Sequence, residues 1–304
     1  MQGPSFLVVG AGRSGTTGLV EGLRGHPDVF VTMPKEPHYF AYHGQRLAFR
    51  GPGDDLGVND TAVTDRDAYL ALYPRGHHHV ALGEGSVSTL YHHERAIPEI
   101  RRVAPDVRIV VLLREPVERA GSAFDYLSQQ GFEPAASLRD AVADEDRRVA
   151  EGWQHLWHYT RMSRYAEAVA AFQDAFGRDR VGGWFYDDLQ ADYAETLRQV
   201  LRFLGTEEHP GELDRVPVVN VSGTPRSRVL QGALHAARAN DTVRRIGKRV
   251  TSFEMREAVR RRLLARHDLD ASVREALAPL FRDDLAALRG LLPEAGQPAW
   301  LCDG

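Results

Sequence analysis

The residues whose types and spacing most suggest chemistry form a glycine-rich turn at residues 10–17, Gly-Ala-Gly-Arg-Ser-Gly-Thr-Thr. An apolar run, Phe6–Val9, precedes the turn, and a helix-compatible segment follows it directly. A strand, a tight glycine turn and a helix N-terminus together point several backbone N–H groups at one place, where they bind an anion. The sequence therefore predicts a phosphate-binding loop. Its expected binding residues are Gly12, Arg13, Ser14, Gly15, Thr16 and Thr17.

Three kinds of phosphate site have glycines at this spacing. Gly10, Gly12 and Gly15 match the dinucleotide-binding pattern G-x-G-x-x-G, in which Glu36 would bind the ribose. The outer two glycines also match the Walker pattern G-x-x-x-x-G-K-[ST], but Thr16 stands where that pattern needs its lysine. A third interpretation places the phosphate-binding cation inside the turn itself, as an arginine.

A second motif follows a predicted buried strand. Residues Arg108–Leu113 form an apolar, largely β-branched run that is typical of a parallel strand. Arg114 follows that run, Pro116 suits the first turn of a helix, and Ser122 lies two turns into that helix. Open α/β sheets bind ligands at the carboxyl ends of their strands. Arg114 and Ser122 are therefore expected to meet at a second phosphate, to which a bidentate arginine binds strongly.

Further elements are needed to position these two motifs. The hydrophobic pattern predicts strands at Val29–Thr32 and Ala81–Glu84 and helices at Thr16–Arg24 and Arg95–Val103. Residues 44–66 are rich in Gly and Asp and lack periodicity, so we expect a loop there.

Taken together, the two motifs resemble those of sulfotransferases that use 3′-phosphoadenosine 5′-phosphosulfate (PAPS). The R-S-G-T-T run from Arg13 is similar to their 5′-phosphosulfate loop, where many members have lysine and the tyrosylprotein and several bacterial branches have arginine. The R-x-P-x-x-R-x-x-S run from Arg114 to Ser122 resembles their 3′-phosphate site. The resemblance implies an α/β, P-loop-NTPase-like fold of three layers, with a central parallel sheet flanked by helices. It also implies PAPS as co-substrate and adenosine 3′,5′-bisphosphate (PAP) as product.

Later segments resemble the same family in the same order. Phe176–Leu189, a predicted strand followed by an acidic turn, is similar to its F-G-x-x-R-V…Y-E-D-L segment, and implies that Tyr186 contacts adenine. Leu197–Gly205 resembles the helix and glycine stop that come next. Asn220–Arg228 resembles the loop that closes over the nucleotide. The 3′-phosphate contacts implied in that loop are Ser222, Gly223 and Arg226.

The segment after the second predicted strand would supply the catalytic groups. Met33–Phe40 resembles the K/N-E-x-H-F-F segment of heparan-type sulfotransferases. The resemblance implies that Glu36 is the general base and that His38 assists it or orients the acceptor. An extended backbone would place these two side chains on one face. In the implied in-line displacement on sulfur, Arg13 bridges the leaving 5′-phosphate and the sulfuryl group, and no metal is required.

The chain departs from the heparan-type pattern at Gly85. Those relatives often have G-E-K-[ST]-P, with a catalytic lysine, where this chain has Gly-Glu-Gly-Ser at residues 83–86. Arg13 is always charged and cannot act as a general acid. Lys35, or an arginine, is therefore the candidate for the missing cation, and a sulfated glycan is not implied as the acceptor.

Composition limits the remaining alternatives. The 304 residues suffice for a single domain, with a core over about residues 5–230 and a helical C-terminal extension over about residues 230–295. A net charge of −4 argues against general nucleic-acid binding. Cys302 is the sole cysteine, so no internal disulfide is expected. The histidines at 77–79 and 92–93 lack ligand spacing, and we expect them in solvated loops rather than at a metal.

Two further features bear on source and location. Arginine makes up 36 of the 38 basic residues, a bias typical of a GC-rich bacterial genome. The sequence has no apolar run of transmembrane length, and the first predicted strand begins within a few residues of Met1, so we expect a cytoplasmic protein. The oligomeric state stays open between a monomer and a homodimer.

The whole sequence predicts a PAPS-dependent sulfotransferase that acts on a hydroxyl of a small molecule, such as a natural product of secondary metabolism or a glycolipid. Loops at residues 41–80 and 125–160 are expected to form a partly apolar acceptor pocket. Two alternatives remain. One is a P-loop small-molecule kinase using ATP and Mg²⁺, against which Thr16 argues; the other is a non-catalytic nucleotide-binding protein of the same fold, against which Glu36 argues.

Overall fold

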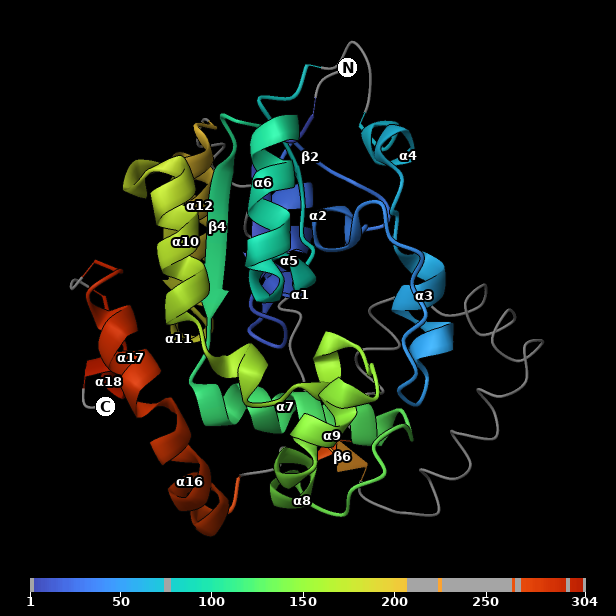
Figure 1. The fold of residues 1–304 in the computed structure, drawn as a ribbon. Coiled ribbons are helices and arrows are strands. Elements are labelled where there is room, and N and C mark those ends of the chain that lie inside the picture. Colours follow the sequence, from blue (N-terminus) through green and yellow to red (C-terminus); the bar gives the residue numbers. More distant parts are fainter. Residues whose placement is uncertain are drawn as a thin grey trace.

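A five-stranded parallel sheet forms the centre of the computed structural model (Figure 1). Its strand order is β2-β3-β1-β4-β5. The structure describes residues 3–73, 78–206, 224–225, 264–265, 269–293 and 296–302. The strands of this sheet are β1 (Phe6–Gly10), β2 (Val29–Val31), β3 (Ala81–Glu84), β4 (Arg108–Leu113) and β5 (Val181–Phe185). Because all five run parallel, their carboxyl ends share one edge of the sheet.

Helices cover both faces of this sheet. The longer ones are α1 (Thr16–Arg24), α6 (His93–Val103), α7 (Pro116–Gln129), α10 (Ala166–Phe176), α12 (Tyr193–Leu204) and α17 (Arg282–Arg289). The shorter α-helices are α2 (Tyr39–Tyr42), α3 (Val58–Thr61), α4 (Arg66–Leu70), α5 (Ser88–Tyr91), α8 (Leu138–Ala143), α9 (Glu145–Ala150), α11 (Tyr186–Ala191), α16 (Ala271–Leu277) and α18 (Ala299–Cys302). Short 3₁₀ turns lie at Asp54–Leu56, His155–Trp157, Arg161–Ser163, Arg178–Arg180 and Ala278–Phe281. A two-stranded antiparallel pair joins β6 (Thr224–Pro225) to β7 (Leu264–Ala265).

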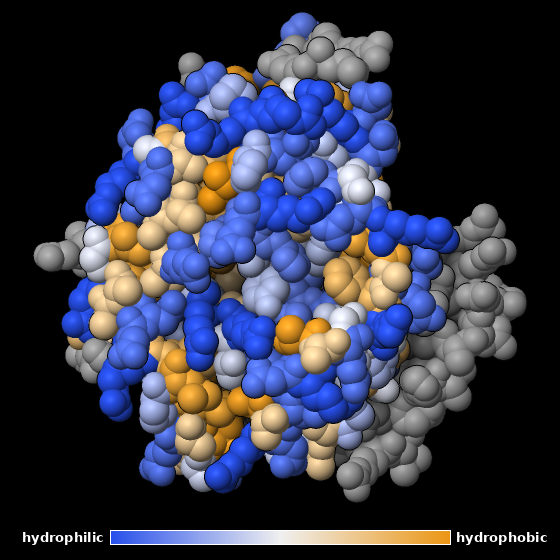
Figure 2. All heavy atoms as spheres, viewed as in Figure 1, coloured by the Kyte–Doolittle hydropathy of each residue, from blue (hydrophilic) through white to orange (hydrophobic). Residues whose placement is uncertain are grey.

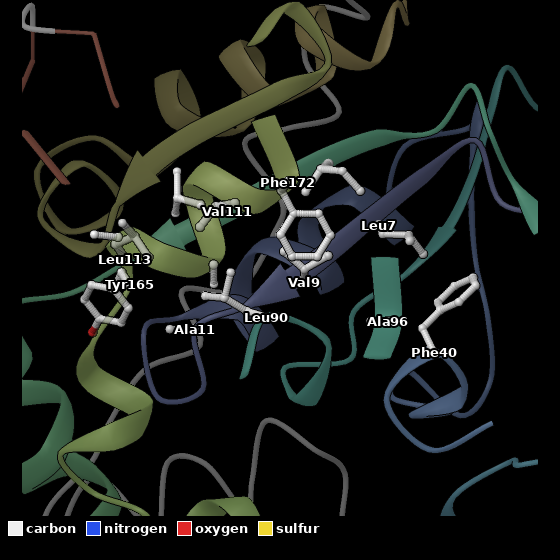
Figure 3. Packing of buried hydrophobic residues seen from close by; sticks show 14 of the residues in the cluster. Leu7, Val9, Ala11, Phe40, Leu90, Ala96, Val111, Leu113, Tyr165 and Phe172 are labelled. Carbon is white, nitrogen blue, oxygen red and sulfur yellow. The ribbon is translucent and has the colours of Figure 1, made fainter. Parts of the chain in front are cut away.

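The two faces of the sheet pack into separate cores, as the alternation of side chains along a strand requires. Leu7 and Val9 of β1 face the layer that contains α6 and α10, where Phe172 covers them (Figure 3). Phe6 and Val8 face the opposite layer, which contains α1 and α12. With both faces buried, the strands are apolar at nearly every position. The predicted three-layer α/β fold with a central parallel sheet is confirmed.

Two predictions about local structure are wrong. Residues 44–66 include α3 and a 3₁₀ turn at Asp54–Leu56, because the buried Asp54 carboxylate accepts hydrogen bonds from Gly51 N (2.8 Å) and from Trp157 Nε1 (3.0 Å). The predicted acidic turn after β5 is instead the helix α11, whose Asp188 accepts a hydrogen bond from Phe185 N (3.0 Å). Both structures depend on side-chain contacts that leave no hydrophobic period in the sequence.

The described C-terminal helices pack against the same core as α10. Leu285 and Leu288 of α17 are buried in the cluster that covers one face of the sheet. The Asp284 carboxylate accepts hydrogen bonds from Tyr165 N (2.8 Å) and Ala166 N (3.1 Å), at the start of α10. No helix among the described residues combines the length and hydrophobicity needed to cross a bilayer. Figure 2 shows the apolar side chains of one face as separate patches among hydrophilic ones.

Candidate active site

The glycine-rich turn leads from β1 into α1, as predicted. Gly15 (φ 92°) takes a left-handed backbone conformation immediately before the helix, and Arg13 (φ 71°) does so within the turn. A Cβ at Gly15 would lie 3.0 Å from Cδ2 of Tyr186, so a side chain there meets both backbone strain and a close contact. The Ser14 hydroxyl is buried and has no hydrogen-bond partner among the described residues. A buried donor in this position matches what a phosphate-binding loop offers to its anion.

Two arginines, Arg13 within the loop and Arg119 outside it, connect the loop to its surroundings. The guanidinium of Arg13 lies 4.5 Å from the ring centroid of Tyr126 in α7, a cation–π contact that directs it toward that helix. Arg119 is completely buried beneath the loop, where its Nη1 lies 3.5 Å from the carbonyl of Gly12 and its Nε donates to Ser163 Oγ (2.6 Å). The loop is therefore held in shape by residues far away in the sequence.

Arg114 connects the second predicted phosphate site to the loop. Its Nη1 lies 3.4 Å from the carbonyl of Arg13, its Nη2 donates to Glu118 (3.2 Å), and its guanidinium stacks 4.4 Å from the ring centroid of Tyr186. Its Nε is buried and has no partner in the part of the chain that the structure describes. Ser122 is buried on α7, two turns from Pro116. Arg114 and Tyr186 thus lie together beside the glycine-rich turn.

A pair of charged residues and a histidine follow β2. Lys35 Nζ lies 2.6 Å from Glu36 Oε1 and 3.4 Å from Thr17 Oγ1 of the loop. His38 Nε2 lies 3.9 Å from Glu36 Oε2, and His38 Nδ1 lies 2.8 Å from the hydroxyl of Ser88. The predicted extended backbone at His38 is wrong, because its φ is 58° and Ser86 Oγ fixes its N–H at 2.9 Å. The two side chains nevertheless face one another.

In these surroundings Glu36 is ionised and His38 is uncharged at neutral pH. Desolvation raises the pKa of Glu36, but the attraction of Lys35 and its hydrogen bond to the carboxylate are the main opposing causes, so the net shift is downward and the group stays ionised at neutral pH. Desolvation also lowers the pKa of His38, against the attraction of Glu36, so His38 is uncharged at neutral pH. An ionised carboxylate beside a neutral imidazole can accept a proton.

Lys35 occupies the space beside Gly85. A Cβ at Gly85 would lie 3.3 Å from Cε of Lys35 and 2.7 Å from Cγ2 of Val20, and Gly85 N donates to the carbonyl of Lys35 (3.0 Å). A larger residue at position 85 would therefore displace Lys35 or Val20. A lysine at position 85 would therefore compete with Lys35 and Val20 for the same space.

A cavity of about 820 Å³ joins the loop to the segment after β2. The predicted site residues that line it are Gly12, Arg13, Thr16, Thr17, Glu36 and His38. Apart from Val87, the rest of its wall comes from the two segments that were expected to form an acceptor pocket, with Val58 and Thr61 from one and Phe132, Gln154 and His155 from the other. Arg114, Ser122 and Tyr186 do not line it, and Ser222, Gly223 and Arg226 lie outside the described residues.

Two residues of the site, His155 and Tyr126, were not predicted from the sequence, because neither follows a recognisable spacing.

The prediction for His92 and His93 is wrong, since they lie not in a solvated loop but at the start of α6. The His92 ring packs between Tyr42 and Tyr91. A second cavity of about 740 Å³ lies beside Tyr91 and His92. Its wall includes Tyr91, His92, His93, Glu94, His158, Arg161 and Glu167.

Comparison with known proteins gives a consistent result. Residues 4–210 match the sequence model of the Sulfotransferase family, in agreement with the predicted resemblance. The chain is 28% identical over 179 residues to carbohydrate sulfotransferase 15 of Mus musculus, an alignment that covers 50% of this chain and 30% of that protein. It is 30% identical over 171 residues to heparan sulfate glucosamine 3-O-sulfotransferase 6 of Homo sapiens, covering 52% of this chain and 43% of that protein. The matched region thus spans less than half the length of these two relatives.

A solved structure resembles the chain over its whole length. The sulfotransferase of Alicyclobacillus acidocaldarius superposes with a TM-score of 0.74, at 27% sequence identity and with 99% of each chain covered.

Proposed function

Since the chain belongs to the sulfotransferase family, we propose that it transfers the sulfuryl group of PAPS to a hydroxyl of a small-molecule acceptor. The observation that carries this proposal is the cavity, in which the phosphate loop with Arg13 and the carboxylate of Glu36 face the same space. The donor would lie at the loop end of that cavity and the acceptor between the loop and the 125–160 segment.

The residues beside the loop fit the two anionic ends of the donor. The buried Ser14 hydroxyl and the N-terminus of α1 suit the 5′-phosphosulfate, since both offer hydrogen-bond donors to an anion. The Arg114 guanidinium, whose buried Nε has no partner among the described residues, suits the 3′-phosphate. The contact between Tyr186 and Arg114 supports a role for Tyr186 at the adenosine of the same donor.

The proposed reaction is a direct displacement at sulfur. The acceptor oxygen forms a bond to sulfur while the bond from sulfur to the 5′-phosphate oxygen breaks, and PAP leaves with that electron pair. The acceptor proton passes to the carboxylate of Glu36, which Lys35 keeps ionised. Arg13 and Lys35 stabilise the negative charge that develops on the leaving phosphate. Lys35 would replace the lysine that heparan-type relatives often have at the position of Gly85, where a side chain would displace Lys35 or Val20.

The acceptor end of the cavity favours an uncharged, partly apolar alcohol or phenol. Its described lining includes Pro52, Val58, Leu127, Phe132 and Leu156, with the amides of Gln130 and Gln154. Among the described lining residues, formal charge is confined to Arg13 and Glu36, at the end where the transfer would occur. A polyanionic acceptor would find no further cation in this part of the wall.

The experiment that tests this function combines a transfer assay with the variant Glu36→Gln. Purified protein is incubated with PAPS and a panel of alcohols and phenols, and PAP release and the sulfate ester are measured. We expect Glu36→Gln to lose turnover by at least about 100-fold, because general base catalysis contributes that much, while PAP affinity is unchanged. Glu94→Gln, in the second cavity, is the matched control and should keep full turnover. Equal turnover in wild type and Glu36→Gln would place the base elsewhere.

A further inference from the structure

We infer that His155 is a specificity residue that donates a hydrogen bond from Nε2 to an oxygen of the acceptor other than the one that reacts. This inference rests on the proposed function and narrows the acceptor to alcohols or phenols that carry a second, hydrogen-bond-accepting oxygen. Three properties of His155 support this inference: it lines the cavity, its proton is on Nε2, and its ring is uncharged.

His155 lies buried in the wall of the larger cavity. Its residue is 1% exposed, it lines the same space as Glu36 and His38, and its ring centroid is 6.2 Å from that of His38. Its Nε2 has no hydrogen-bond partner in the described part of the chain. Buried polar atoms are nearly always paired in folded proteins, so we take the unpaired Nε2 of this cavity-lining residue as the atom that a ligand would engage.

Tyr42 determines which ring nitrogen of His155 carries the proton. Its hydroxyl lies 2.7 Å from Nδ1 of His155 and 3.2 Å from Nε2 of His92. Bonds in which a hydroxyl donates are typically shorter than those in which an N–H donates, and the hydroxyl has one proton to give. Tyr42 therefore donates to His155 and accepts from His92. Since Nδ1 of His155 accepts a hydrogen bond, its proton is on Nε2, the atom that has no partner among the described residues.

His155 stays uncharged, so it offers a directed donor rather than a positive charge. Burial, together with the nearby His92, His38 and His158, lowers the pKa of His155 well below its ordinary value. A neutral imidazole with its proton on Nε2 can only donate at that atom. The atom that it recognises is therefore a carbonyl, ether or hydroxyl oxygen, and not a protonated amine.

The rings around Tyr42 do not have the arrangement of a metal site. Among the described residues, three potential metal-ligating atoms come within 4.8 Å of one another at His93, Glu94 and Glu167, which belong to the second cavity. The ring nitrogens of His38, His92 and His155 do not form such a group, because the Tyr42 hydroxyl lies between the rings of His92 and His155. The cluster instead sets the proton on His155.

The second cavity offers a matched control. His158 is paired with Tyr91 as His155 is with Tyr42, with the tyrosine hydroxyl 2.7 Å from Nδ1 of the histidine. His158 and Tyr91 line the second cavity and not the one that holds Glu36. The variants His158→Leu and Tyr91→Phe therefore make the same chemical changes outside the acceptor pocket.

The kinetic test compares the 2-, 3- and 4-methoxyphenols with the ethylphenols of the same substitution, which match them in shape but lack the second oxygen. We expect wild type to have a KM about tenfold lower for at least one methoxyphenol than for its ethyl counterpart, the effect of one neutral hydrogen bond. His155→Leu should remove this difference and Tyr42→Phe should reduce it. His155→Gln, which keeps a donor, should retain part of it. His158→Leu and Tyr91→Phe should preserve it, and PAP affinity should be unchanged in all variants.

A second readout does not depend on an acceptor. Nitrogen-15 NMR of the histidine rings at neutral pH should show His155 as the neutral form with its proton on Nε2, and Tyr42→Phe should reduce that preference. A proton on Nδ1, a charged ring, or a methoxyphenol preference that survives in His155→Leu would overturn the inference. Failure of wild type to release PAP with any alcohol or phenol would instead count against the proposed function, and the NMR result would still decide the state of His155.

Discussion

Two carboxylates within the same part of the fold take opposite protonation states because their surroundings differ. Glu36 lies at the cavity, beside Lys35, and its pKa is lowered. Glu84, at the end of β3, is fully buried, and its carboxylate is partnered by the N–H of Ser86 (2.6 Å). Burial raises the pKa of Glu84 to about 8, and repulsion by Glu36 adds to the effect. Of these two carboxylates, Glu36 therefore carries the negative charge at neutral pH, where the proposed reaction requires a base.

This difference predicts a pH dependence of stability. The pKa of Glu84 in the folded protein, about 8, exceeds its ordinary value of 4.5, so the folded state keeps a proton that the unfolded state releases between these values. Its contribution to stability is complete below about pH 4.5 and is lost as the pH rises through about 8. The variant Glu84→Gln should remove a slope of up to about 1.4 kcal/mol per pH unit in that window.

The measurement is urea unfolding of wild type and Glu84→Gln between pH 5 and pH 8. Glu99→Gln is the control, because the pKa of Glu99 is lowered and its contribution is lost only as the pH falls. Parallel stability curves for wild type and Glu84→Gln would show that Glu84 is ionised in the folded state.

The functional unit at the next scale is the strand, turn and helix formed by β1, residues 11–15 and α1. Its turn needs a left-handed residue immediately before α1, and Gly15 provides it with a φ of 92°. The position is also crowded, because Tyr186 and Leu189 of α11 approach within 3.0 and 3.1 Å of where a Cβ would be. The turn, and with it the direction of the N–H groups, depends on the packing of a helix far along the chain.

Gly15→Ala should therefore destabilise the protein more than backbone strain alone accounts for. Gly44→Ala is the matched control, because Gly44 has a φ of 67° and a Cβ there would have no atom within 4 Å among the described residues. We expect Gly44→Ala to cost about 1–2 kcal/mol and to leave PAP affinity unchanged. Gly15→Ala should cost more and should weaken PAP binding, as measured by thermal unfolding and calorimetry. Identical effects of the two variants would remove the role of α11 in shaping the turn.

The elements that hydrophobic period and capping signals specify were predictable from sequence. The five strands and helices α1, α6, α7 and α12 follow from apolar runs, from Pro116 at a helix start and from Gly205 at a helix end. The left-handed backbone at His38 and the turn organised by Asp54 were not, because each depends on side chains distant in sequence, Ser86 in one case and Trp157 in the other. His155 escaped prediction for the same reason, since its contact with Tyr42 joins residues far apart in the sequence.

At the scale of the whole molecule, residues at the carboxyl ends of all five strands meet at one edge of the sheet. Arg13 follows β1, Glu36 follows β2, Ser86 follows β3, Arg114 follows β4 and Tyr186 follows β5. Parallel strand order places these residues together without any closeness in sequence. The 41–80 and 125–160 segments then add the uncharged wall of the cavity. This division separates a charged end of the cavity, proposed for the donor, from a largely uncharged end, proposed for the acceptor.

The measurement that tests the account most directly is calorimetric titration of the protein, without added metal, with PAP and with adenosine 5′-phosphate. We expect wild type to bind PAP more tightly, and Arg114→Ala to lose roughly 10- to 100-fold in PAP affinity with little change for adenosine 5′-phosphate. Arg108→Ala, at the opposite end of the same strand, is the control and should bind both as wild type does. Equal affinity of wild type for the two nucleotides, or equal losses for both in Arg114→Ala, would contradict the assignment of a 3′-phosphate site and with it the proposed donor.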